Sequence, residues 1–235
     1  MLVFDIITLF PDAFYGPFAE SIIARAEKNG LVKINTVDLR NYTTDKHRSV
    51  DDKPYGGGPG MLMTPDPVFK AVENLKTKDS LVILMSPQGK VYKQKMAYEL
   101  SNQKHLIIIC GHYEGLDERI REQLVDIEIS MGDYILTNGN IPAMALVDSV
   151  VRLIPGVLGS VESAETESFA DGLLEYPQYT RPEVYRGMKV PDVLLSGNHQ
   201  KIKEWRNKKA HDRTLERRPE LLKQNNKEYI NELDG

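Results

Sequence analysis

Alternating blocks of apolar and polar positions divide the first 155 residues into strands and helices. Short apolar or alternating runs bounded by turn residues are typical of strands, and apolar positions at helical spacing are typical of helices. The predicted strands are residues 4–9, 31–39, 81–85, 106–110 and 126–129. The predicted helices are residues 11–29, 66–76, 93–102, 117–124 and 142–154. Because strands and helices alternate, the pattern favours an α/β fold with a mostly parallel sheet.

The pattern changes after Pro155-Gly156, where periodicity is lost. Residues 157–179 are acidic and aperiodic, which is typical of a linker, and short helices are predicted at residues 182–187, 199–209 and 219–226. We therefore predict a domain of residues 1–158, a flexible linker of residues 159–179 and a small all-α domain of residues 180–235.

Composition limits the class of protein. A chain of 235 residues with 41% hydrophobic residues can bury a full core. The sequence contains no run of 18 apolar residues and no basic segment ahead of an apolar one at its start, so we expect neither a membrane span nor a signal peptide and predict a cytoplasmic protein. The single cysteine, Cys110, cannot form an internal disulfide or a cysteine zinc cluster, and we expect a buried thiol.

Charge is distributed unevenly along the chain. Residues 178–235 contain 13 Lys and Arg against 9 Asp and Glu, whereas residues 1–177 contain 17 against 25. The basic excess is concentrated in residues 199–223, where nine basic residues face four acids. Such a run is either a solvated helical face or a surface that neutralises the phosphates of a polyanion.

Three predicted strands end in loops rich in small and turn residues. Ser86-Pro87-Gln88-Gly89 follows the first strand, Gly111 to Gly115 follows the second, and the segment from Ser130 to Pro142 follows the third. A single loop of this kind reads as a plain connection. In α/β sheets, however, ligands bind outside the carboxyl ends of the strands, so three such loops predict one shared pocket.

Two common phosphate-binding motifs are absent from the sequence. It contains neither the phosphate loop G-x-x-x-x-G-K-[ST] nor the dinucleotide fingerprint G-x-G-x-x-G, which disfavours a nucleotide triphosphatase and an ordinary dinucleotide enzyme. The glycine-rich segment of residues 54–60 is either a flexible lid or a backbone cradle.

An ordered set of motifs carries a family resemblance. The motifs are Pro54-Tyr55-Gly56-Gly57-Gly58-Pro59-Gly60-Met61, Ser86-Pro87-Gln88-Gly89, Cys110-Gly111-His112-Tyr113-Glu114-Gly115, residues 130–142, Ile154-Pro155-Gly156-Val157-Leu158-Gly159, Tyr179-Thr180-Arg181-Pro182 and Leu194-Leu195-Ser196-Gly197-Asn198-His199. Together they resemble the bacterial tRNA (guanine-37-N1)-methyltransferases, the TrmD family of the SPOUT class. The resemblance runs over nearly the whole chain, and the order of the motifs makes it specific.

The resemblance implies a fold and partners that composition does not show. It implies a parallel sheet threaded into a deep trefoil knot, an exception to the rule that folds are unknotted. It also implies S-adenosylmethionine as methyl donor, an association with Mg²⁺ whose site is unknown, and a homodimer with active sites at the subunit interface. The expected partners are tRNA and a second copy of the chain, with no membrane and no DNA.

The resemblance also assigns a donor pocket, residue by residue. The residues assigned to it are Met85, Ser86, Pro87, Gly111, Tyr113, Glu114, Ser130, Met131, Gly132, Asp133, Tyr134, Ile135, Leu136, Gly139 and Pro142. The loop of residues 47–60 is expected near the target nucleotide. Asn138 and Asn140, where the family more often has Gly and Glu, are departures, and Asn138 is expected at the pocket mouth.

Methylation of guanine N1 requires a base for the N1 proton and a cation for the charge that develops on O6. The resemblance assigns these roles to Glu167, which stands where the family has Asp, and to Arg152. Asp171 is the rival base. Without the resemblance, Arg152 reads as a helix-terminal cation and Glu167 as a solvated linker acid.

Two alternatives stay open at this point. One is a related SPOUT methyltransferase that acts on another RNA. The other is a catalytically silent RNA-binding protein, which the substitution of Glu167 for the family aspartate keeps under consideration.

Overall fold

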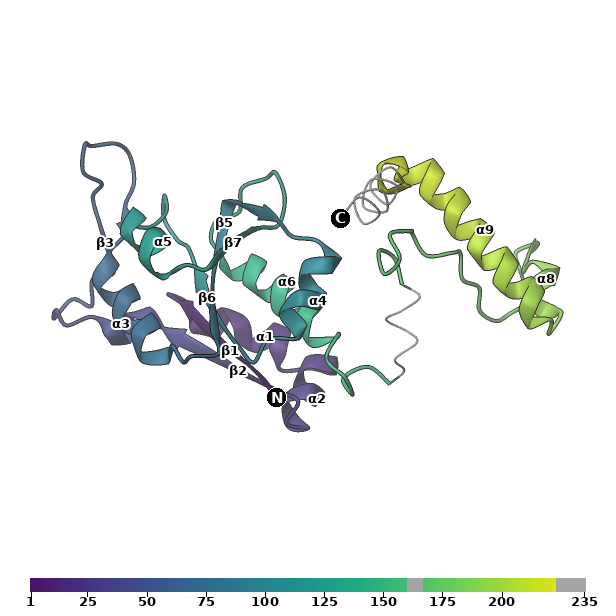
Figure 1. The fold of residues 1–235 in the computed structure, drawn as a ribbon, viewed down its shortest axis with the longest axis horizontal. Coiled ribbons are helices and arrows are strands. Elements are labelled where there is room, and N and C mark those ends of the chain that lie inside the picture. Colours follow the sequence, from purple (N-terminus) through teal and green to yellow (C-terminus); the bar gives the residue numbers. More distant parts are fainter. Residues whose placement is uncertain (160–166, 223–235) are drawn as a thin grey trace, which may run out of the picture. The chain divides into compact units, whose positions relative to one another are not determined.

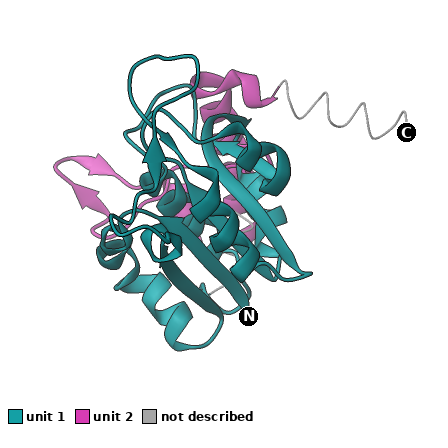
Figure 2. Cartoon of the chain, turned by 90° about the vertical axis from the view of Figure 1, so that its left-hand side faces the viewer, with its two compact units in different colours: residues 1–159 teal, residues 160–235 magenta. Residues whose placement is uncertain are grey.

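The structure is a computed structural model that describes residues 1–159 and 167–222. The chain divides into two compact units, Met1–Gly159 and Ser160–Gly235, coloured separately in Figure 2. Each unit has its own helices and strands.

A five-stranded parallel sheet forms the centre of the first unit (Figure 1). Its strands are β1 (Leu2–Thr8), β2 (Val32–Asp38), β5 (Ser80–Val91), β6 (His105–Cys110) and β7 (Ile127–Ser130). They lie in the order β2-β1-β6-β5-β7, so the three strands that precede the predicted pocket loops are neighbours. The predicted α/β fold with a parallel sheet is confirmed for this unit.

Helices cover both faces of this sheet (Figure 1). One face packs against α1 (Tyr15–Phe18), α2 (Ser21–Lys28), α4 (Gln94–Ser101) and α6 (Asn140–Val151). The other face packs against η2 (Leu39–Tyr42), α3 (Pro65–Leu75) and α5 (Glu118–Leu124). Burial on both faces explains why the central strands are almost continuously apolar. No helix in the described part of the chain is long and apolar enough to cross a membrane.

The single helix predicted for residues 11–29 is wrong. The segment forms η1 (Pro11–Phe14), then α1, and then α2, which begins at Ser21 with a positive φ of 59°. The predicted stop is confirmed, because Gly30 has a φ of 69° and its N–H donates to the carbonyl of Glu27 at 2.9 Å. A left-handed residue after the last turn is the usual way to end a helix.

Strand β5 is longer than predicted and contains a large bulge. Met85 and Lys90 both pair with Ile129 of β7, so residues 86–89 leave the ladder between them. The Oγ of Ser86 accepts a hydrogen bond from the N–H of Gln88 at 3.2 Å inside the bulge. A Cβ at Gly89 would lie 2.4 Å from backbone atoms of β7, so only glycine fits where the strand resumes.

A short hairpin, β3 (Asp51–Asp52) and β4 (Leu62–Met63), encloses the glycine-rich segment of residues 54–60. The hairpin is joined to the loop after β6 by main-chain hydrogen bonds. The N–H of Met63 donates to the carbonyl of Gly115 at 3.0 Å, and the N–H of Glu114 donates to the carbonyl of Met61 at 3.1 Å. The hairpin therefore lies beside the predicted pocket.

The second unit is not purely helical, which corrects the predicted all-α domain. Residues 182–187 form no helix; they contain β8 (Val184–Tyr185), which pairs with β9 (Met188–Lys189). Arg186 and Gly187 make the turn with φ angles of 50° and 78°, as a tight hairpin turn requires. An additional short helix, α8, spans Asp192–Leu195.

The second unit contains the long helix α9 (His199–Arg217). This helix begins where predicted and continues beyond residue 209, where the predicted helix ends. The predicted cap is confirmed: the Oδ1 of Asn198 accepts a hydrogen bond from the N–H of Lys201 at 3.1 Å. Residues 219–222 are helical as predicted, and the rest of the helix predicted at residues 219–226 lies outside the described residues.

Cys110 should react slowly with thiol reagents in the native protein. Its side chain is fully buried at the end of β6, and this burial raises the pKa of the thiol. Because the thiolate is the reactive form, we expect 5,5′-dithiobis(2-nitrobenzoic acid) to modify the native chain at least about a hundredfold more slowly than the chain in guanidinium chloride. Equal rates in the two conditions, measured at pH 8 by absorbance, would show that Cys110 is accessible.

Candidate functional site

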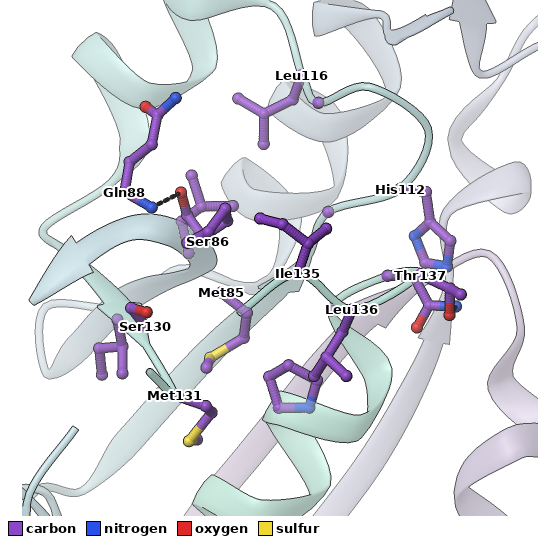
Figure 3. Close-up of a pocket in the computed structure, with 18 of the residues that line it drawn as sticks. Met85, Ser86, Gln88, His112, Leu116, Ser130, Met131, Ile135, Leu136 and Thr137 are labelled. Atoms are coloured by element: carbon purple, nitrogen blue, oxygen red, sulfur yellow. Dashed lines mark hydrogen bonds between the residues drawn. The ribbon is translucent and has the colours of Figure 1, made fainter. Parts of the chain in front are cut away.

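A cavity of about 430 Å³ lies at the carboxyl ends of β6 and β7 and at the bulge of β5 (Figure 3). It exists because these neighbouring strands bring their loops together. The lining residues are Leu84, Met85, Ser86, Pro87, Gln88, Gly111, His112, Tyr113, Glu114, Gly115, Leu116, Arg121, Ile129, Ser130, Met131, Tyr134, Ile135, Leu136, Thr137, Asn138, Gly139 and Pro142.

Thirteen of the fifteen residues predicted for the donor pocket line this cavity, and Gly132 and Asp133 do not. Gly132 shapes the loop instead. Its φ is 145°, its N–H donates to the Oγ of Ser130 at 3.2 Å, and its carbonyl accepts from the N–H of Tyr134 at 2.9 Å. The tight turn places Tyr134 and the residues after it along the cavity.

Nine lining residues are not among the fifteen assigned individually: Leu84, Gln88, His112, Gly115, Leu116, Arg121, Ile129, Thr137 and Asn138. Of these, Asn138 was expected at the pocket mouth. Most of them stand within or beside the strand-end motifs, so the sequence carried a signal for them. Arg121 differs, because it comes from α5 and is placed by helix packing. Its guanidinium forms an ion pair with Glu128 of β7 at 2.8 Å.

The loop after β7 is fixed at its far end across β6 and β1. The N–H of Gly139 donates to the carbonyl of Gly111 at 2.8 Å. The Oδ1 of Asn138 accepts from the N–H of Asn140 at 2.9 Å, and the buried Oδ1 of Asn140 accepts from the hydroxyl of Thr8 at 2.9 Å. The two asparagines therefore anchor the start of α6, and Asn138 also lines the cavity.

The cavity offers main-chain polar groups together with an apolar wall. Figure 3 shows Met85 of β5 beside Ile135 and Leu136 of the loop after β7, and all three line the cavity. Its volume of about 430 Å³ lies within the range of small-molecule sites. A flat heterocycle with ring nitrogens and an exocyclic amine suits such a wall, because backbone N–H and C=O groups can pair with both. The lining thus fits the adenosyl part of S-adenosylmethionine.

His112 is buried in the cavity wall, with 5% of its surface exposed. A carbonyl oxygen can only accept, so the contact of 2.9 Å between Nδ1 and the carbonyl of Cys110 places the proton on Nδ1. Burial lowers the pKa of His112, which keeps the ring neutral. Nε2 has no hydrogen-bond partner among the described residues, and the ring packs on Phe10 with centroids 5.4 Å apart.

The two predicted catalytic residues lie in different units. Arg152 follows the last residue of α6 in the first unit, and its N–H donates to the carbonyl of Asp148 at 3.4 Å. Glu167 belongs to the second unit. The distance between Arg152 and Glu167 is not defined, because the relative position of the two units is not determined.

The segment that carries Glu167 is folded onto α9. The N–H of Leu174 donates to the Oγ1 of Thr214 at 2.8 Å, and the guanidinium of Arg213 donates to the carbonyl of Glu175 at 3.0 Å. The rival acid, Asp171, uses its Oδ1 to accept the N–H of Leu173 at 3.3 Å, as in a side-chain-closed turn. Asp171 therefore has a structural role in this segment.

No group of three or more His, Cys, Asp or Glu residues that could hold a metal ion is present among residues 1–159 and 167–222.

Comparisons with known proteins agree with the motifs. A family model described as tRNA (Guanine-1)-methyltransferase TrmD matches residues 2–224. A tRNA (guanine-N(1)-)-methyltransferase of Dictyoglomus turgidum is 58% identical over 222 residues, which cover 94% of this chain and 90% of the relative. Relatives with the same description are 57% identical over 219 residues in Carboxydothermus hydrogenoformans, covering 93% and 87%, and 57% identical over 224 residues in Bacillus cereus, covering 94% and 91%. The resemblance is thereby confirmed, and the chain belongs to the tRNA (guanine-1)-methyltransferase TrmD family.

Proposed function

We propose that this protein transfers the methyl group of S-adenosylmethionine to N1 of guanine 37 in tRNA, the nucleotide immediately 3′ of the anticodon. The observation that carries the proposal is the family match over residues 2–224, which spans both units. The cavity built from three strand-end loops supports it independently, because it offers the shape and main-chain groups that the donor needs.

In this proposal the donor site is formed by the thirteen assigned residues that line the cavity, and Gly132 and Asp133 belong to the loop after β7 that carries part of this lining. Bound S-adenosylmethionine supplies an electrophilic methyl group on its sulfonium. Backbone groups near Gly111 and Gly139 orient the adenine, and Leu136 and Pro142 cover its faces. The hydrogen bond between Ser130 and Gly132 stabilises the turn that precedes the apolar lining residues. Gly132 therefore contributes to donor binding through the shape of the loop.

Arg152 and Glu167 carry the chemistry. As the bond from N1 to the methyl carbon forms and the bond from sulfur to that carbon breaks, the N1 proton passes to the carboxylate of Glu167. The guanidinium of Arg152 stabilises the charge that develops on O6. The positions of the two residues within the family motifs support these roles.

The active unit is a homodimer in which each site draws on both copies. Arg152 and Glu167 lie in separate units of one chain, which suits a site that combines the first unit of one copy with the second unit of its partner. Residues 1–158 form the donor-binding domain, residues 159–179 the linker and residues 180–235 the tRNA-binding domain. The protein acts in the cytoplasm, where tRNA is found, and Mg²⁺ takes part without an assigned site.

In this proposal the chain of the first unit is threaded into a deep trefoil knot at the parallel sheet. Family membership supports this element of the proposal, and so does the path of residues 131–139. This segment leaves β7 at the sheet edge and reaches the loop after β6 through Gly139, and the next residue, Asn140, contacts Thr8 of β1, so the chain crosses β5, which lies between β7 and β6.

Transfer of radiolabelled methyl from S-adenosylmethionine tests the activity. Transcripts of one tRNA that carry guanine, adenine or uridine at position 37 are compared, and label is expected only in the guanine transcript. Label at another position would assign the protein to a different RNA target. Binding of S-adenosylhomocysteine and tRNA without any transfer would identify a silent RNA-binding protein.

The basic face of α9 is expected to contact tRNA phosphates. Lys201, Lys208 and Lys209 are exposed on this helix, so changing all three to alanine should weaken tRNA binding and lower the slope of log affinity against log salt by about two to three. Arg206 is left intact because its guanidinium packs 4.8 Å from the ring centre of Tyr176. Filter binding at several salt concentrations measures the effect.

The exposed acid Glu216 on the same helix provides the control, because Glu216→Ala should not weaken tRNA binding. Affinity for S-adenosylhomocysteine should be the same in both variants. An unchanged salt slope in the triple variant would show that the basic residues form only a solvated face.

A further inference from the structure

Arg121 brings a charged side chain into the cavity wall from helix α5. Among the described residues that line the cavity it is the one Lys or Arg, and its side chain is 23% exposed. A guanidinium stays protonated in proteins, so Arg121 carries its full charge in this position. A charge that is largely removed from water requires an opposite charge nearby. The partners of Arg121 therefore determine where its guanidinium lies.

Two glutamates from different elements pair with this guanidinium. The Nε of Arg121 lies 2.8 Å from the Oε1 of Glu128 on β7. The Nη1 of Arg121 donates to the Oε2 of Glu118, one turn earlier on α5. The side chain of Glu118 is 61% exposed, whereas that of Glu128 is 22% exposed. Water screens an exposed pair on a helix surface and leaves it weak, so Glu128 is the partner that fixes Arg121.

Glu128 does not line the cavity, but its backbone lies between segments that do. It pairs with Leu84 across the ladder of β5 and β7 and is followed by Ile129, and both of these neighbours line the cavity. A Cβ added to Gly89 would lie 2.4 Å from the carbonyl carbon of Glu128, so the bulge of β5 packs directly on this residue. The Oε2 of Glu128 is buried and has no hydrogen-bond partner among the described residues. The sheet therefore fixes the position from which the carboxylate reaches Arg121.

Arg121 and Gln88 separate the cavity from a second hollow. This hollow has a volume of about 300 Å³ and is bordered by the bulge, by Arg121 and by residues 125–128. Because Gln88 and Arg121 line both spaces, they form the partition between them. If the guanidinium moved into the second hollow, the cavity would open at this point.

We propose that Glu128 is a positioning residue for the donor pocket: its carboxylate holds the guanidinium of Arg121 in the partition, and this keeps the cavity in the shape that binds the methyl donor. The inference rests on the proposed function, since it takes the cavity as the donor site. Without the carboxylate, Arg121 keeps only its exposed partner, Glu118, and the guanidinium moves outward to where water solvates it.

Calorimetry with S-adenosylhomocysteine in the absence of tRNA compares the two glutamates. Glu128→Gln keeps the size of the side chain and removes its charge, and it should lower affinity about five- to fiftyfold, as expected for groups coupled through a mostly buried contact. Glu118→Gln is the matched control, because it removes the exposed partner of the same guanidinium and should stay within about twofold of the wild-type affinity. A loss in Glu118→Gln as large as that in Glu128→Gln would overturn the proposal.

A double-variant comparison separates positioning of Arg121 from a general role of Glu128 in β7. Arg121→Gln removes the guanidinium, so adding Glu128→Gln to it should lower affinity little further, because the pair is already broken. If Glu128→Gln lowered affinity as much in this background as in the wild-type protein, Glu128 would act through the strand and not through Arg121.

Thermal unfolding identifies the variants that are folded when binding is measured. Should Glu128→Gln not fold, Arg121→Gln breaks the same pair from the helix, and it must lower affinity at least about fivefold for the proposal to stand.

The outcomes distinguish the failure of this proposal from that of the proposed function. Wild-type affinity in folded Glu128→Gln would overturn the positioning role while leaving the donor site intact. If the wild-type protein bound no S-adenosylhomocysteine, the donor site itself would be wrong, and the positioning role would fall with it.

Discussion

Gly139→Ala should lower the affinity for S-adenosylhomocysteine by about ten- to hundredfold, as overpacking at a fixed backbone contact does. The backbone of Gly139 has an ordinary φ of −78°, so the cost arises from space alone. A Cβ there would lie 2.8 Å from the Cα of Cys110 and 2.9 Å from the backbone N of Gly111. These are backbone atoms at the end of β6 and cannot move aside as a side-chain tip can. The loop of residues 131–139 must therefore shift and open the cavity wall.

Gly16→Ala is the matched control. Gly16 lies in helix α1 and, like Gly139, lacks a positive φ, but a Cβ added to it meets nothing within 4 Å. Its affinity for S-adenosylhomocysteine should equal that of the wild-type protein by calorimetry. Circular dichroism at the same temperature checks that Gly139→Ala is folded when it is measured. Equal affinities in the two variants would mean that residues 131–139 do not bind the donor.

The apolar runs predicted the strands of the sheet correctly, because strands that are buried on both faces are almost entirely apolar. All six residues of β6 are buried, as expected for a strand covered by helices on both faces. Loops that follow such strands gather at one sheet edge, which is why thirteen of the fifteen residues assigned to the pocket line one cavity. What the sequence does not contain is the strand order, because neighbours in a parallel sheet are chosen by packing across long connections.

Local conformations that depend on packing were predicted poorly. At the bulge in β5 the backbone of β7 lies against Gly89, a contact between distant segments that no local sequence pattern indicates. The hairpin at residues 184–189 turns at Arg186-Gly187. Its first turn position holds arginine in place of the asparagine or aspartate that commonly marks such turns. Without that signal, the sequence of this segment is as consistent with a short helix as with a hairpin.

The proposed catalytic residues illustrate a different limit. A cation at a helix end and an acid in an aperiodic segment are common for structural reasons, so Arg152 and Glu167 had no signal of their own. They were assigned by their places within motifs. His112 shows the reverse case: it stands in a strand-end motif, but its neutral ring and buried Nε2 follow from burial and from the carbonyl of Cys110. The environment of a side chain decides its chemistry, and one sequence read alone does not supply that environment.

Glu167→Gln should slow methyl transfer by about a hundred- to ten-thousandfold, the usual effect of removing a general base. The amide keeps the size of the side chain and loses the ability to accept the N1 proton. Affinities for S-adenosylhomocysteine and tRNA should therefore stay close to those of the wild-type protein, and the loss should appear in the rate of a single turnover. Glu167→Asp restores the residue that the resemblance associates with this position and should retain most of the activity.

Asp171→Asn is the decisive comparison, because Asp171 is four residues away and also carries a carboxylate. Its Oδ1 accepts the N–H of Leu173, and asparagine keeps that acceptor, so the turn should persist and transfer should stay within about threefold of the wild-type rate. Single-turnover rates at saturating donor and tRNA measure both variants under the same conditions. The opposite ranking, with transfer abolished in Asp171→Asn and near the wild-type rate in Glu167→Gln while both ligands still bind, would make Asp171 the base and Glu167 a linker acid.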